Sequence, residues 1–60
     1  MQFAIYMKTA NTFLGEGWLG KGDEVGSLEA RVLFTVREMA ETLPMLVWHD
    51  IEEVKIVRIS

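Results

Sequence analysis

The chain of 60 residues contains no cysteine, one proline and one histidine. Without cysteine, disulfides and thiolate metal sites are excluded, and His49 supplies only one of the several ligands that a zinc site requires. A chain of this length buries only about 60% of the surface that its unfolded form exposes. The sequence therefore predicts one small domain over residues 1–60, stabilised further by self-association or by a partner.

Basic residues are also scarce, with 6 Lys and Arg against 9 Asp and Glu and a net charge of -3. A protein that binds nucleic acid directly needs a basic face to replace phosphate counterions, so this class is not expected. No uncharged stretch approaches the roughly 18 residues of a membrane span. Residues 1–8 lack a basic region ahead of their apolar run, so we expect no secretory signal and a cytoplasmic location.

The first half of the chain favours two strands and a loop. Residues 2–8 alternate between two faces and are rich in β-favouring types, which predicts a strand. A turn at 11–12 precedes a second, glycine-weakened strand over 13–19. Residues 20–26 combine glycines and charges without an apolar period, so they are interpreted as a loop.

The middle of the chain contains a helix start. Ser27 is placed to cap a single turn over 28–30, and residues 31–34 fit either a continuing helix or a short strand, with the β-branched and aromatic content favouring the strand. Thr35 and Glu38 have the spacing of a capping box, so the helix is expected to begin directly after Thr35.

Four apolar residues at helical spacing predict one stripe that packs on the sheet. They are Val36, Met39, Ala40 and Leu43. Pro44 either ends this helix or kinks it as far as Trp48. The four methionines, at positions 1, 7, 39 and 45, are interpreted as adaptable core filling.

The chain closes with a polar loop over 49–53 and a last strand over 54–59. This strand is apolar on both faces, so it is either central in the sheet or covered by a partner. The resulting fold class is α+β: a three- or four-stranded, mostly antiparallel sheet with one helix packed on one face, in the order β-β-α-β. The uncovered face or an edge strand is the leading interface candidate. Its expected residues are Ala4, Tyr6, Leu14, Trp18, Val57 and Ile59.

Residues 15–22, GEGWLGKG, satisfy G-x-G-x-x-G and come one residue short of a phosphate-binding loop. Gly22 replaces the hydroxyl residue, and Asp23 and Glu24 place negative charge where phosphate would lie. We interpret the glycines as hairpin and loop positions and expect no cofactor.

Other polar pairs predict no chemistry. The adjacent carboxylates Asp23-Glu24 and Glu52-Glu53 are interpreted as solvated charges, and His49-Asp50 as surface residues. We therefore expect no catalytic residue and no metal ligand. Trp18 and Trp48 lie at element edges, where tryptophan serves either the core or an interface.

A familiar arrangement runs through the chain: Leu28-Glu29-Ala30, then Leu33-Phe34-Thr35, then the helix start Val36-Arg37-Glu38-Met39-Ala40. Over residues 28–43 and, loosely, both terminal strands, this resembles small proteins encoded by phages and prophages. Met39 stands where that pattern usually has alanine. The resemblance implies a phage-type accessory protein, a group that includes anti-CRISPR proteins and inhibitors of host defence nucleases, which are often acidic and dimeric.

Size and acidity favour a non-enzymatic protein-binding module, in its specific form a phage-encoded inhibitor that covers a basic, nucleic-acid-contacting surface of a host protein. The alternative is a structural or accessory homo-oligomer without inhibitory activity, for which a homodimer is the simplest form. The expected partner-binding residues are Glu16, Trp18, Asp23, Glu24 and Glu29.

Overall fold

The computed structural model describes residues 1–10 and 15–60, with the side chains of 23 and 47–49 left out. The predicted turn at 11–12 and the first two residues of the predicted second strand lie outside the described residues. The elements are β1 (Phe3–Thr9), β2 (Glu16–Leu19), the 3₁₀ turn η1 (Lys21–Asp23), β3 (Val25–Gly26), α1 (Val36–Thr42), the 3₁₀ helix η2 (Leu43–His49) and β4 (Ile51–Arg58).

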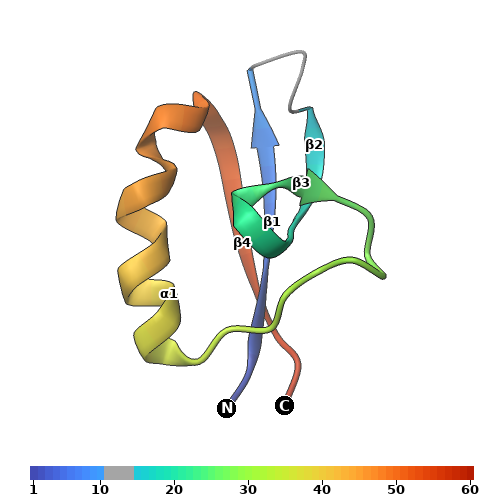
Figure 1. The fold of residues 1–60 in the computed structure, drawn as a ribbon, viewed down its shortest axis with the longest axis vertical. Helices are drawn as coiled ribbons and strands as arrows, with labels where there is room; N and C mark the ends of the chain where they lie inside the picture. Colours follow the sequence, from blue (N-terminus) through green and yellow to red (C-terminus); the bar gives the residue numbers. More distant parts are fainter. Residues whose placement is uncertain (11–14) are drawn as a thin grey trace.

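The strands form one sheet in the order β3-β2-β1-β4, and each neighbouring pair is antiparallel. α1 and η2 run on from each other as one helical layer at the side of the sheet (Figure 1). The chain termini lie together at one end, where the Gln2 N–H donates to the Ser60 carbonyl at 3.0 Å. The predicted α+β class, sheet and single α-helix are confirmed.

The register divides the sheet into two faces. Ile5 lies opposite Ile56 and Met7 opposite Val54, and cross-strand partners in an antiparallel ladder point to the same face. Ile5 and Met7 are fully buried, so this face looks toward the core. The alternate residues of β1, among them Tyr6, therefore point to the opposite face, as period-2 alternation requires.

Among the described residues, six buried apolar side chains pack together as the core, and they come from both layers and from the segment before α1. They are Ile5, Met7, Leu19, Phe34, Met39 and Leu46. The predicted helix stripe is partly wrong, because Val36 is 55% exposed and Ala40 is also exposed. The residues that face the core are instead Met39, half-buried Leu43 and Leu46. The chain continues helically from α1 into η2, so the buried side of the helical layer extends beyond α1 to Leu46.

The methionines divide equally between core and surface. Met7 and Met39 are buried as predicted, whereas Met1 is 70% and Met45 61% exposed. Met1 lies outside β1, and Met45 lies on the outer side of η2, so neither reaches the core.

The predicted capping box is confirmed. The Thr35 hydroxyl accepts the Glu38 N–H at 3.2 Å, and the Glu38 carboxylate accepts the Thr35 N–H at 2.9 Å. Both bonds satisfy backbone donors that a helix start leaves without partners. At the other end, α1 stops at Thr42 and Pro44 lies at the start of η2. Pro44 thus ends the α-helix while the chain continues as a 3₁₀ helix, because a proline near a helix start sacrifices no bonded N–H.

The segment over 20–26 is not the plain loop that its glycines predicted. It contains η1 and the two-residue strand β3, which pairs with β2 through Leu19 opposite Val25 and Trp18 opposite Gly26. The expected turn over 28–30 is present, because the Ala30 N–H donates to the Ser27 carbonyl at 3.2 Å. Residues 31–34 form no helix, and isolated bridges join Arg31 to Gly20 and Phe34 to Phe3, which favours the strand-like alternative. Phe3 and Phe34 exchange backbone hydrogen bonds.

β4 differs from the expected last strand in its start and in its neighbours. It begins at Ile51, inside the stretch 49–53 interpreted as a polar loop. Asp50, with φ 50°, turns the chain, and Ile51 packs against the core, so pairing with β1 begins there. Within the described residues β4 is an edge strand, so its two apolar faces do not reflect a central position.

Candidate protein-binding face

β1 and β2 position an aromatic pair on the sheet face away from the core. Tyr6 and Trp18 are direct cross-strand partners, and their neighbours Ile5, Met7 and Leu19 fill the core on the other side. Alternation along both strands therefore places the two aromatic rings side by side.

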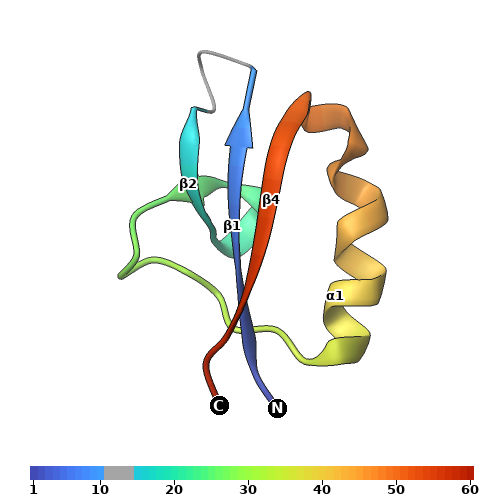
Figure 2. The same cartoon turned by 180° about the vertical axis from the view of Figure 1, so that it is seen from behind.

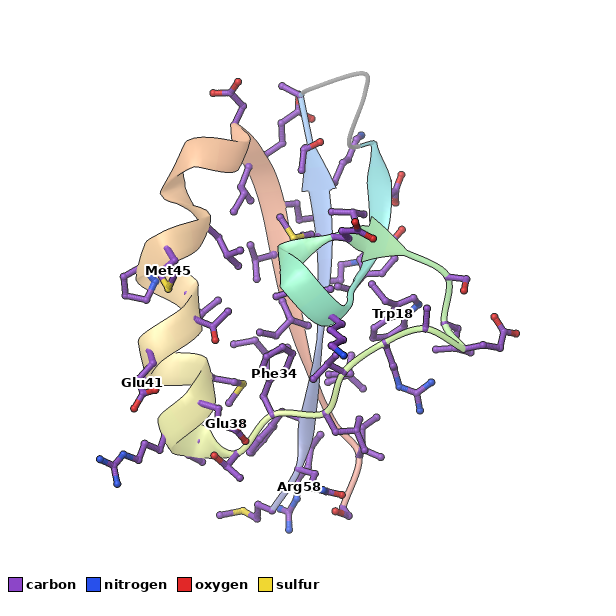
Figure 3. The ribbon with its side chains drawn as sticks, in the orientation of Figure 1. Trp18, Phe34, Glu38, Glu41, Met45 and Arg58 are labelled. Carbon is purple, nitrogen blue, oxygen red and sulfur yellow. The ribbon has the colours of Figure 1, made fainter. Side chains whose placement is uncertain are left out.

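The rings meet edge to face. Their centroids are 5.2 Å apart with an interplanar angle of 74°, the arrangement in which the positive edge of one ring meets the negative face of the other. The guanidinium carbon of Arg31 lies 5.9 Å from the centre of the Trp18 ring, within the range of a cation–π contact. Trp18 stays half-buried. Figure 3 shows Trp18 well separated from the α1 residues Glu38 and Glu41.

Glu16 places a negative charge next to the Tyr6–Trp18 pair. It is exposed on β2 two residues before Trp18, and its carboxylate accepts a hydrogen bond from the Tyr6 hydroxyl. This hydrogen bond is the main reason that the pKa of Tyr6 lies above its usual value of 10.0; desolvation and the negative charges of Glu16 and Glu53 add to it. The neutral phenol is thus held in place as a donor.

Arg31 is the residue of this face that sequence reasoning missed. Its segment runs beside β2, since Gly20 and Arg31 form a bridge and the Val32 N–H donates to the Leu19 carbonyl at 3.1 Å. One guanidinium nitrogen donates to the Leu28 carbonyl at 2.9 Å, whereas Nε is buried without a hydrogen-bond partner in the described part of the chain. The only feature of the sequence that could have indicated this role is that Arg31 is a basic residue at the start of the strand-like stretch 31–34.

Two ion pairs border the aromatic residues on the β1 and β4 side. Lys55 lies opposite Tyr6 and its Nζ is 3.5 Å from a Glu53 oxygen, while Lys8 Nζ lies 4.0 Å from a Glu52 oxygen. All four side chains are about half exposed or more, so each pair contributes little to stability. The face therefore carries both signs of charge around an aromatic centre.

The five predicted partner-binding residues divide into three groups. The structure brings Glu16 and Trp18 together through Tyr6. Glu24 and Glu29 are exposed, and no described contact links either of them to the aromatic pair. The side chain of Asp23 lies outside the described part of the structure, as do Leu14 and the side chains of Trp48 and His49. Ala4 is fully buried and is therefore not a surface residue of this face.

The glycine motif of residues 15–22 forms strand β2 and its two ends. Gly15 and Gly22 have positive φ values of 70° and 71°, which glycine adopts without strain. Gly17 lies so close to β3 that a Cβ built on it would approach the Gly26 carbonyl oxygen to 2.5 Å. The glycines thus have a conformational and packing role in this sheet.

Among the described residues, no group of three His, Cys, Asp or Glu side chains is placed to hold a metal ion. No helix of the described chain has the length and apolar character needed to cross a membrane. Comparison of the chain with protein-family models, curated proteins and solved structures found no match.

Proposed function

We propose that the chain is a non-enzymatic protein-binding module that uses the sheet face around Trp18. The observation that carries this proposal is the half-buried Trp18 ring, positioned by Tyr6 and Arg31 on a face away from the core. A ring held in one orientation before binding loses little conformational entropy on contact, and tryptophan is enriched among residues that dominate interface energies.

The partner surface that fits this face is basic with an apolar centre. Glu16 borders the aromatic pair, Glu24 and Glu29 are exposed in the segments that follow β2, and the net charge is -3. The net negative charge of the molecule, with Glu16 beside the aromatic pair, steers a basic surface toward it and makes the association rate depend on salt, while Lys8, Lys55 and Arg31 add positive charges at this face. The proposed partner is thus a protein with clustered Lys and Arg.

In its more specific form, the proposal makes the chain a phage-type inhibitor that covers a nucleic-acid-contacting surface of a host protein. The support is the resemblance over residues 28–43 together with the acidity. Surfaces that contact nucleic acid are rich in Lys and Arg, so an acidic module has the matching charge.

A pull-down from bacterial lysate at low and high salt tests the binding proposal with three variants. We expect a retained protein that is lost with Trp18→Ala, weakened with Glu24→Lys and weakened by salt. Arg37→Glu is the control, because the Arg37 side chain is 90% exposed on α1, away from the face. Circular dichroism establishes that each variant is folded. If no protein is retained, or if Trp18→Ala retains it unchanged, the proposal is wrong.

A further inference from the structure

On its side away from β1, β4 has a row of backbone N–H and C=O groups that point out of the sheet. Their direction follows from the hydrogen bonds that β1 makes on its side away from β4. The Phe3 N–H donates to the Phe34 carbonyl at 2.8 Å and the Phe34 N–H returns the bond at 2.7 Å. The Thr9 N–H donates to the Gly15 carbonyl at 3.0 Å. The odd-numbered residues of β1 therefore direct their backbone groups away from β4.

Residues of an antiparallel strand bond alternately to one neighbour and to the other. The even-numbered residues of β1 thus bond to β4, through the partners Val57, Lys55 and Glu53. The N–H and C=O groups of the alternate residues Val54, Ile56 and Arg58 must then point outward. Every residue of β4 from Glu52 to Arg58 is exposed, and no described strand pairs with β4 on its outer side, where the helical layer of α1 and η2 stands beside it (Figure 2).

The same strand exposes apolar side chains on both faces. Val54 and Ile56 are 38% and 47% exposed on the core side, and Val57 and Ile59 are 38% and 40% exposed on or just beyond the opposite side. A long edge with open backbone groups and apolar side chains is a template for pairing with another strand. The register shift near Lys8 is confined to the start of β4, so the stretch from Glu53 to Arg58 pairs regularly.

The order of charges along β4 favours an antiparallel second copy of the chain as the strand that pairs with this edge. The strand begins with two acids, Glu52 and Glu53, and continues with two bases, Lys55 and Arg58. An antiparallel copy places the acidic beginning of each β4 beside the basic end of the other, whereas a parallel copy places like charges together. Opposite charges across neighbouring strands stabilise pairing and like charges oppose it.

From the free edge and this charge order, we propose that β4 pairs antiparallel with β4 of a second copy of this chain. The result is a closed two-fold dimer with one continuous sheet. The proposal is independent of the binding function assigned to the Trp18 face, because Trp18 lies on β2, with β1 between it and this edge.

Two charge-reversal variants test the pairing without requiring a particular register. Glu52→Lys with Glu53→Lys makes β4 wholly basic, and Lys55→Glu with Arg58→Glu makes it wholly acidic. Sedimentation of the full chain over a dilution series is expected to show a dimer for the native chain and roughly tenfold or greater weakening for each variant alone. Mixing the two variants is expected to restore a dimer, because an all-basic strand then meets an all-acidic one.

The matched control is Lys21→Glu with Arg37→Glu, which changes the net charge as much as the acidic variant but lies on η1 and α1. It is expected to remain dimeric. Ile56→Pro is a second probe, since it removes an outward N–H without a bond to β1 and is expected to yield a folded monomer. A monomeric native chain, variants that dimerise as the native chain does, or a mixture that stays monomeric would each overturn the proposal.

Discussion

Tyr6 connects the two strands of the candidate protein-binding face through its ring and its hydroxyl. The ring packs on Trp18 and the hydroxyl donates to Glu16, so both ends of the side chain are engaged. Because Tyr6 is the only tyrosine of the chain, its ionisation is directly observable in the ultraviolet spectrum.

Replacing the acceptor of this bond is expected to change the titration of Tyr6. The fold raises the pKa of Tyr6 above 10.0, mainly through the hydrogen bond to Glu16. The resulting stabilisation is therefore present below pH 10 and is lost as the pH rises through the folded-state pKa. Glu16→Gln is expected to lower the pKa in a phenolate absorbance titration, because it removes the negative charge of the acceptor. An unchanged pKa would show that Glu16 does not hold the phenol in solution.

At the scale of elements, the absence of a side chain at Gly17 allows β2 and β3 to approach closely. A Cβ on Gly17 would meet the Gly26 carbonyl oxygen at 2.5 Å and the Val25 side chain at 3.1 Å. A Cβ on Gly26 would meet nothing within 4 Å. The two glycines of this pair therefore respond differently to the same substitution.

Gly17→Ala is expected to lower the free energy of unfolding by about 1–3 kcal/mol, because backbone atoms must move to admit the methyl group. Gly26→Ala is the control and is expected to stay within about 0.5 kcal/mol of the native value. Urea unfolding followed by tryptophan fluorescence measures both. Equal effects of the two substitutions would contradict the close β2–β3 approach.

At the scale of the molecule, the described part of the chain has a core cluster of six buried side chains. A core of this size seldom supplies more than about 3–5 kcal/mol, so the fold is sensitive to each of its members. Contact with a second copy or a partner adds stability that depends on concentration.

Leu19→Ala is expected to leave much of the protein unfolded at room temperature. Leu19 is fully buried in the core, and truncating a buried leucine costs about 2–5 kcal/mol. Leu28→Ala, at a position that is 47% exposed, is expected to leave the melting temperature nearly unchanged. Thermal unfolding followed by circular dichroism measures both, and a native-like melting temperature for Leu19→Ala would contradict this description of the core.

Local patterns predicted those parts of the fold whose causes lie within a few residues. The alternation over 2–8 predicted β1, and the spacing of Thr35 and Glu38 predicted both bonds of the capping box. β3 was missed because its pairing depends on a close contact with Gly17, nine residues earlier, rather than on its own composition. Arg31 was missed because its contact with Trp18 exists only after residues 31–34 lie beside β2.

The sequence by itself determined the α+β class and the helix start, because alternation and capping act over short distances. Only the tertiary structure decided that β4 lies at the edge. A strand with two apolar faces has the same sequence pattern whether it is central in the sheet or pairs with a strand of another molecule. The pattern therefore does not show how many neighbouring strands it has. The order β3-β2-β1-β4 follows from packing of the whole chain, and that order leaves the β4 edge open within the described residues.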